Sequence, residues 1–164
     1  MPERRLIVMR HAKSSWSGNL PDHERPLNGR GRTAAPLVAA ELVRCGWTPD
    51  VVVASDARRT VETWERMRET FSPTPYIVID PALYLSGYSE LVSAGVQLSD
   101  TWQTALFLGH NPGWEMAASH FSGEPIEMKT GMAVLLKTEA ADWKSAFQAQ
   151  AWQLAAIIRP RDLA

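Results

Sequence analysis

The chain has 164 residues, of which 45% are hydrophobic and 21% charged, values that are ordinary for one globular domain with a sizeable core. Its formal net charge of −1 excludes an overall field that would attract nucleic acid or an anionic membrane. The sequence shows no apolar run of transmembrane length and no secretory leader pattern, so we expect a single cytoplasmic domain over residues 1–164. Cys45 is the only cysteine, which excludes a disulfide framework, and its apolar surroundings predict a buried thiol.

The first part of the chain predicts a strand, a long loop and a helix. Residues 5–9 are predicted to form a strand buried on both faces, because residues 6–9 are a continuous apolar run, and residues 12–29 have the composition of a loop. Apolar residues then recur at helical spacing. This helix starts either with Thr33 as its N-cap, which places Pro36 in the first turn, or near Gly29, in which case Pro36 should kink it.

The remaining elements alternate between strand and helix. Ser55 is a suitable cap for a helix that runs to about Phe71, and Asn111 is a suitable cap for another helix with Pro112 at its first position. A further helix is predicted over residues 89–98. The other predicted strands cover residues 51–54, 76–79, 105–108, 133–137 and 152–158. This alternation favours an α/β fold in which helices cover both faces of a mostly parallel sheet.

Three of the predicted parallel strands end at cationic or titratable side chains. The first delivers Arg10 and His11, the second is followed by Arg58 and Arg59, and the fourth delivers His110. Ligands of open α/β sheets bind beyond the carboxyl ends of the strands, so these residues could meet in one crevice. Arginine and histidine together suit an oxyanion, with phosphoryl as the leading candidate. The alternative is that the two helix arginines are merely solvated surface residues.

Four motifs lie at these strand ends or in the first loop, in the order "RHAKSSW", "DHERPLNGRGR", "SDARRTVET" and "GHNP". Together they resemble the histidine phosphatase superfamily, and within it the small bacterial phosphohistidine phosphatases of the SixA type. The resemblance covers nearly the whole chain. It implies a three-layer α/β/α sandwich with a mostly parallel central sheet, as in phosphoglycerate mutase-like folds. It also implies that the protein needs no metal and no organic cofactor.

The resemblance implies a catalytic set of four residues. His11 corresponds to the nucleophile that accepts the phosphoryl group, and Arg10 is its neighbour in the Arg-His pair. Arg59 lies four residues after Ser55, as in the family's "SxxxR" pattern, and His110 corresponds to the second histidine. The ring nitrogen of His11 that does not attack should donate to a backbone carbonyl of the following loop, which fixes the tautomer.

Three further residues are candidates for substrate binding. Arg25 corresponds to an arginine that often lines the mouth of the site in the family, and Ser17 stands where larger members keep an asparagine near the phosphate. Arg58 is the alternative to Arg59 as the residue that holds phosphate. Trp16 and Trp114 lie beside the expected site, where they could contact a protein substrate or belong to the packing of the fold.

The sequence departs from the commonest family motif after Arg-His, where it has Ala12 and Lys13 in place of glycine and an acidic residue. Some branches of the family also carry a glutamate that acts as a general acid. Glu90 and Glu115 are candidates for that role, although each fits a helix-surface carboxylate better. An imidazole leaves phosphorus more easily than an alkoxide, since its reference pKa is about 6.5. A site without a clear acid therefore suits phosphohistidine.

These observations predict a phosphatase that removes phosphate from phosphohistidine on a protein through a phosphohistidine enzyme intermediate. The expected partner is a phosphorylated protein or a small phosphorylated substrate, with no nucleic acid and no membrane. Two alternatives remain open, namely a phosphatase for small phosphoesters and a non-catalytic phosphate-binding module of the same fold. The presence of both histidines favours an enzyme, because a pure binder has no need of a nucleophile.

Overall fold

The computed structural model describes residues 2–148 and 152–163. A six-stranded sheet runs through these residues in the order β3-β2-β4-β1-β5-β6. β1, β2, β3 and β4 pair in parallel, whereas β5 pairs antiparallel with β1 and with β6. The strands are β1 (Glu3–Arg10), β2 (Val51–Ala54), β3 (Tyr76–Ile79), β4 (Thr104–Gly109), β5 (Ala133–Glu139) and β6 (Gln153–Ile158). The prediction of a mostly parallel central sheet is confirmed, with an antiparallel pair at one side.

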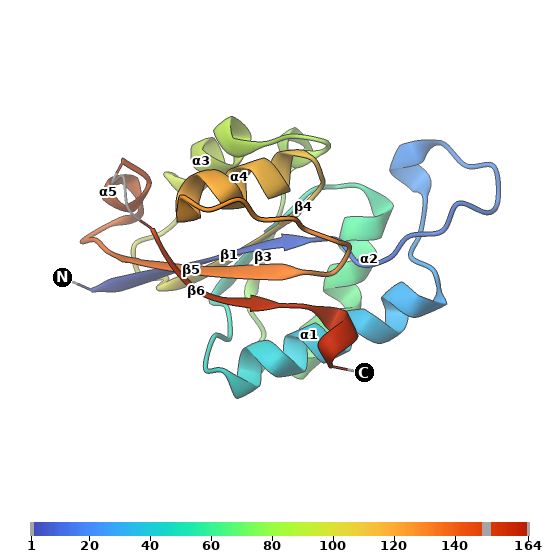
Figure 1. The fold of residues 1–164 in the computed structure, drawn as a ribbon, viewed down its shortest axis with the longest axis horizontal. Helices are drawn as coiled ribbons and strands as arrows, with labels where there is room; N and C mark the ends of the chain where they lie inside the picture. Colours follow the sequence, from blue (N-terminus) through green and yellow to red (C-terminus); the bar gives the residue numbers. More distant parts are fainter. Residues whose placement is uncertain (1, 149–151, 164) are drawn as a thin grey trace.

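Helices cover both faces of this sheet, which gives the predicted three layers (Figure 1). One layer of the core packs under α1 and α2, and the other packs under α3, α4 and α5. The α-helices are α1 (Gly29–Arg44), α2 (Arg58–Met67), α3 (Tyr88–Gly95), α4 (Gly113–Ser122) and α5 (Trp143–Gln148). Short 3-10 turns are η1 (Asp22–Glu24), η2 (Arg68–Thr70), η3 (Pro81–Leu83) and η4 (Pro160–Asp162).

The central strands are apolar throughout because both of their faces are buried. In β1, the side chains of residues 6–9 are completely inaccessible to solvent, and alternate residues enter the two opposite layers of the core. Burial of each such side chain contributes about 1.5–3 kcal/mol. No described helix is long and apolar enough to cross a membrane.

The position of β4 between β2 and β1 determines what the sheet presents at its carboxyl edge. Arg10 lies opposite Gly109 in the β1–β4 register, and Ala54 lies opposite Leu108 in the β2–β4 register. The residues that follow these three strands are therefore neighbours in space, although up to a hundred positions separate them in the sequence. This edge is the crevice that the α/β topology predicts.

Two predicted helix starts are wrong in detail, and for a third helix the structure confirms the alternative start near Gly29. α1 begins at Gly29, where the side chain of Asn28 accepts the Gly31 N–H at 2.9 Å, so Thr33 is not the cap and Pro36 lies inside a continuous helix. α2 has Ala57 at its N-cap, because the Ser55 hydroxyl is directed to another partner described below. α4 begins one residue after Pro112, which takes the N-cap position itself.

Two predictions about burial also need correction. Cys45 was expected inside the core, but it follows the last residue of α1 at the end of the amphipathic stripe and is exposed. Trp114 was considered for contact with a substrate, but it is completely buried and its indole N–H donates to the Phe107 carbonyl at 3.0 Å. Trp16 is largely exposed.

Candidate active site

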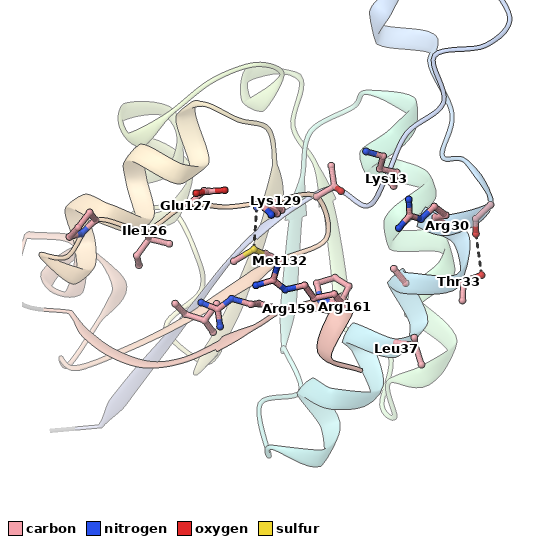
Figure 2. A pocket seen from close by; sticks show the side chains of 16 residues that line it. Lys13, Arg30, Thr33, Leu37, Ile126, Glu127, Lys129, Met132, Arg159 and Arg161 are labelled. Carbon is pink, nitrogen blue, oxygen red and sulfur yellow. Dashed lines mark hydrogen bonds between the residues drawn. The ribbon is translucent and has the colours of Figure 1, made fainter. Parts of the chain in front are cut away.

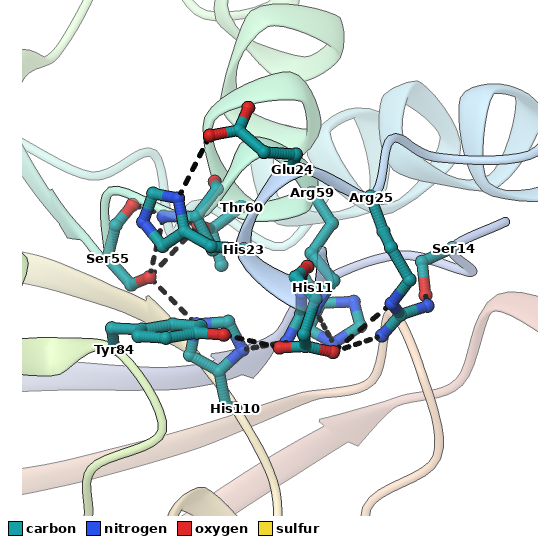
Figure 3. Close-up of polar contacts among 12 residues, drawn as sticks. His11, Ser14, His23, Glu24, Arg25, Ser55, Arg59, Thr60, Tyr84 and His110 are labelled. Atoms are coloured by element: carbon teal, nitrogen blue, oxygen red, sulfur yellow. Dashed lines mark hydrogen bonds and ion pairs between the residues drawn. The ribbon is translucent and has the colours of Figure 1, made fainter. Parts of the chain in front are cut away.

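His11 stands at the centre of the polar cluster beyond the carboxyl ends of the parallel strands (Figure 3). Its side chain is 5% exposed, and its Nδ1 lies 2.7 Å from the Ala12 carbonyl oxygen. Since a carbonyl only accepts, Nδ1 carries the proton and Nε2 keeps a lone pair. Burial lowers the His11 pKa to about 3, and the nearby positive charges act in the same direction. The ring is therefore neutral across the physiological pH range, as a nucleophile must be.

Arg59 brings a buried positive charge against this ring. It is the second residue of α2, and its Nε donates to His11 Nε2 at 3.2 Å. The outer part of the guanidinium donates to Asp22, to the backbone carbonyl at 2.8 Å and to the carboxylate at 3.1 Å. These contacts fix the guanidinium beside the imidazole nitrogen that carries the lone pair.

His110 lies on the other side of Arg59. Its Nδ1 is 3.4 Å from Arg59 Nη2, its Nε2 forms a 2.7 Å hydrogen bond with the Ser55 hydroxyl, and its ring centroid is 5.4 Å from that of His11. The Ser55 hydroxyl also accepts the Ala57 N–H at 3.1 Å, so the start of α2 and the second histidine are linked through one side chain. Burial, followed by the charge of Arg59, lowers the pKa of His110 to about 3.

Arg10 approaches from the end of β1. Its Nη1 donates to the Met128 carbonyl at 3.1 Å, whereas its buried Nε has no hydrogen-bond partner among the described residues. Burial lowers the pKa of the Arg10 guanidinium, but the normal value is so high that the group stays charged. A buried cationic N–H that no protein group satisfies fits a site for an anionic ligand.

Asp22 connects the cluster to the loop between β1 and α1. Its carboxylate accepts hydrogen bonds from Arg59, from the Tyr84 hydroxyl, and from Arg25 at 3.2 Å. The Tyr84 hydrogen bond, followed by those of the two arginines, lowers the Asp22 pKa to about 2. Asp22 is therefore ionised at neutral pH and holds the guanidinium groups in place.

Arg25 is a buried residue of the loop between β1 and α1, and it contacts other residues of this loop. Its guanidinium donates to the Ser14 hydroxyl at 2.9 Å and stacks on Trp16, with 3.6 Å between the guanidinium carbon and the ring centroid. Arg25 thus connects Asp22 of the cluster to an exposed aromatic ring.

Two of the predicted substrate-binding residues lie outside the cluster. Arg58 is exposed, and the Ser17 hydroxyl is exposed and pairs with Ser15 at 2.8 Å. Both candidate acids accept a backbone hydrogen bond, and the charge of Glu115 also acts on the nearby Arg10 guanidinium. Glu90 accepts the Gly87 N–H at the start of α3, and Glu115 accepts the Met128 N–H at 2.8 Å.

Sequence reasoning missed two members of the cluster. Tyr84 follows η3 and belongs to none of the sequence motifs that indicated site residues. Ser55 was noted as a helix cap, and only the pairing of β2 with β4 reveals that it faces His110. Among the described residues, no group of three histidine, cysteine, aspartate or glutamate side chains is arranged to hold a metal ion.

Comparison with known proteins places this geometry in a family. The sequence model of the histidine phosphatase superfamily, branch 1, matches residues 6–84, the part that contains Arg10, His11 and Arg59. An uncharacterized chloroplastic protein from Arabidopsis thaliana is 35% identical to this chain in an alignment 171 residues long, gaps included. The alignment covers 96% of this chain and 78% of the relative. The chain belongs to the histidine phosphatase superfamily.

Solved structures share the fold of this chain over nearly its whole length. A structure assigned to the phosphohistidine phosphatase SixA of Nakamurella multipartitia has a TM-score of 0.84 at 24% identity and covers 98% of both chains. The protein histidine phosphatase SixA in complex with tungstate has a TM-score of 0.82 at 16% identity, over 98% of this chain and 99% of that one. The protein is thus a histidine phosphatase superfamily member with the SixA-type fold.

Proposed function

We propose that this protein is a phosphohistidine phosphatase that works through a phosphohistidine intermediate on His11. The observation that carries the proposal is the state of the His11 ring. Its Nδ1–H is held on the Ala12 carbonyl, and its Nε2 lone pair faces a guanidinium 3.2 Å away. A neutral imidazole beside fixed positive charge is suited to attack an anionic phosphoryl group.

In the first step, the Arg59 Nε–H, which donates to His11 Nε2 in the free protein, turns to a phosphoryl oxygen of the substrate. The released Nε2 lone pair of His11 then forms a bond to phosphorus while the bond from phosphorus to the substrate nitrogen breaks. The substrate imidazole enters with a proton from solvent on its other ring nitrogen, so it departs as a neutral ring that keeps the electron pair of the broken bond. Arg10, Arg59 and His110 would hold the phosphoryl oxygens, and the unpaired Arg10 Nε–H supplies one of the donors. In the second step, water forms a new P–O bond while the bond from phosphorus to His11 Nε2 breaks, so His11 regains its lone pair. The proton of the attacking water leaves with phosphate or passes to solvent.

The choice of phosphohistidine rests on the leaving group. Glu90 and Glu115 are bound to backbone N–H groups, and Asp22, with a pKa of about 2, has no proton to donate at neutral pH. An alkoxide needs such a proton, whereas an imidazole that is protonated near neutral pH departs without help from the enzyme. The SixA phosphatases whose fold this chain shares are named for phosphohistidine or protein histidine, which supports the same substrate class.

A second candidate function is hydrolysis of a small phosphoester. A mycobacterial glucosyl-3-phosphoglycerate phosphatase in complex with VO3 has a TM-score of 0.68 at 17% identity and covers 93% of this chain. The non-catalytic alternative has less support, because a phosphate binder has no use for a histidine with an oriented lone pair.

The test compares three leaving groups on one preparation, namely phosphoimidazole, an aryl phosphate and an alkyl phosphate. We expect kcat/KM to fall in that order, with the alkyl ester slower than phosphoimidazole by about 10²–10⁴, the usual contribution of a general acid. If the alkyl phosphate were hydrolysed as fast as phosphoimidazole, the site would contain a general acid. Hydrolysis of small phosphoesters would then replace phosphohistidine hydrolysis as the proposed function.

We further propose that residues 1–164, which include positions outside the described ranges, act as one domain. Arg25 is proposed to contact the substrate at the mouth of the crevice, whereas Ser17 and Arg58, which are exposed and lie outside the cluster, are given no substrate contact in this proposal. The proposed partner is a protein that carries phosphohistidine. A cytoplasmic location and activity without a metal ion stay predictions.

A further inference from the structure

A second hollow lies beside the crevice, between the start of α1 and the antiparallel strands β5 and β6 (Figure 2). It has a volume of about 870 Å³, and we call it the basic groove. Arg30 comes from α1, Lys129 from the segment before β5, and Arg159 and Arg161 from the end of β6 and η4. Lys13, from the loop after β1, completes the cationic side chains that line it.

The charge of this groove differs from that of the whole chain. Five basic side chains and one acidic side chain, Glu127, line it, whereas the complete sequence has 17 basic and 18 acidic residues. The rest of the chain therefore has 12 basic and 17 acidic residues. A positive groove on a protein with excess negative charge elsewhere attracts and orients an acidic partner at that one place.

Most of these cations have no acidic partner within the described part of the chain. Some arginines elsewhere pair with carboxylates, as Arg44 does with Glu41 and Arg32 does with Glu62 at 2.7 Å. Others, such as the exposed Arg58 and Arg68, have no ion pair among the described residues, but they do not gather in one hollow. Of the five cations in the groove, only Arg161 has an ion pair among the described residues, at 3.9 Å to its exposed neighbour Asp162. The groove thus keeps positive charge available for a ligand.

The basic groove and the active site share one wall, the segment from Met128 to Met132. The Met128 carbonyl accepts from Arg10, and the Gly131 N–H donates to the His11 carbonyl at 2.8 Å. Pro160 packs so closely on Gly131 that a Cβ there would lie 2.9 Å from the proline ring. A chain bound in the groove would therefore lie against the same segment that supports Arg10 and His11.

Apart from Thr33 and Thr130, the remaining side chains of the groove are apolar, and none of the lining residues is aromatic. Its lining includes Leu37, Ile126, Met132, Ile157 and Pro160. Single-stranded nucleic acid is held by aromatic platforms on which bases stack, and the groove has none. Apolar surface between cations suits a polypeptide in which acidic and apolar side chains alternate.

We propose that the basic groove docks an acidic segment of the substrate protein, next to the phosphohistidine that enters the active site. This proposal rests on the phosphohistidine phosphatase function proposed above. Docking would let the enzyme choose among phosphohistidine proteins by the charge of their surface, while the reacting group stays the same.

The test uses two phosphohistidine peptides of equal length, one with alternating Glu and Leu around the histidine and the other with Gln in place of Glu. We expect kcat/KM at low salt to be roughly tenfold higher for the acidic peptide, since a few exposed ion pairs at 0.2–1 kcal/mol each sum to that factor. The preference should shrink at high salt, because these charges are exposed to solvent.

The variants place one charge reversal on each wall of the groove. Arg30→Glu/Arg161→Glu should abolish the preference, whereas Arg68→Glu, a reversal of an exposed arginine outside the groove, should keep it. Turnover of phosphoimidazole, which is too small to reach the groove, should be equal in all three proteins. Loss of the preference in the control, or its survival in the double variant, would overturn the proposal.

Binding of the unphosphorylated acidic peptide, measured by fluorescence anisotropy, separates this proposal from the proposed function. If neither phosphohistidine peptide is hydrolysed but the acidic peptide binds and the double variant does not bind it, the function is wrong and the groove proposal stands. Tighter binding of a single-stranded oligonucleotide than of the acidic peptide would contradict the proposed occupant.

Discussion

The carboxyl edge of the parallel strands and the basic groove beside the antiparallel strands both collect positive charge, but they hold it in different ways. At the parallel edge, Arg59 is 2% exposed and each end of its guanidinium is bound to protein groups. In the groove, Arg30 and Arg161 are exposed, and most of the cations there have no carboxylate partner in the described structure.

The difference indicates two kinds of recognition. A buried, hydrogen-bonded cation is costly to place but acts strongly on a small group at a fixed position. Exposed cations act weakly one by one, tolerate different partners and lose effect as salt rises. The first arrangement suits the transferred phosphoryl group, and the second suits a variable protein surface around it.

The largest effect is expected from the buried arginine of α2. Arg59→Ala should lower kcat/KM by about 10²–10³, as the loss of one oxyanion donor does in other enzymes. Arg58→Ala is the matched control and should stay near the wild-type rate, because Arg58 is exposed next to Arg59. Arg59→Lys, which keeps the charge but not the fork geometry, should be intermediate. A crippled Arg58→Ala beside a normal Arg59→Ala would reverse our assignment.

A second prediction concerns stability against pH. The pKa values of His11 and His110 in the folded protein, about 3 each, lie below the unfolded value of about 6.5. The unfolded chain then binds more protons between these values, so the stability that is full above pH 6.5 is lost as the pH falls toward 3. Each histidine should contribute a slope of about 1.4 kcal/mol per pH unit in this window.

Urea unfolding between pH 7 and pH 5 checks this slope. His110→Asn should reduce the slope, whatever its effect on stability at pH 7. His23 has its pKa raised by Asp56, so it acts in the opposite direction, but it is too exposed to reverse the trend. A free energy of unfolding that stays constant over this range would show that the two buried rings are not held neutral.

A smaller effect is expected from Ser55, which positions His110. Ser55→Ala removes the hydrogen bond to His110 Nε2, and a lost hydrogen bond of about 1 kcal/mol corresponds to a several-fold decrease in kcat. The ring nitrogen shifts of His110 should change in the same variant by NMR. Ser122→Ala, at the end of α4, loses a hydroxyl that contacts only its local backbone and Ser119, so both readouts should be unchanged. Unaltered His110 shifts in Ser55→Ala would refute the positioning role.

No effect at all is expected from metal removal. In the proposed mechanism Arg10 and Arg59 supply the positive charge that a metal ion provides in other phosphatases. Dialysis against EDTA should therefore leave the turnover of phosphoimidazole intact. Strict dependence on added zinc or magnesium would force a different assignment for His11 and His110.

The sequence predicted the parallel edge well, for a physical reason. Strands buried on both faces read as continuous apolar runs, and the residue that ends such a run must lie at the rim of the sheet. Arg10, His11 and His110 were located from this rule, and the ring nitrogen of His11 was correctly expected to donate to a carbonyl of the following loop.

Contacts made by tertiary structure alone could not be predicted in this way. Tyr84 and Asp22 meet across 62 positions of the sequence, and neither lies at the end of a strand. Ser55 is a residue type that often caps helices. Its actual partner is His110, and this contact depends on the position of β4 next to β2. The groove depends on the antiparallel placement of β5 and β6, and the sequence pattern did not specify that direction.

Trapping of the phosphorylated enzyme tests the central claim most directly. Rapid quench of the wild-type protein with labelled phosphoimidazole, followed by peptide mapping, should show acid-labile phosphate on His11. The label should be absent from His11→Ala under the same conditions. Label on any other residue of the wild-type protein, or label that persists in His11→Ala, would contradict the account.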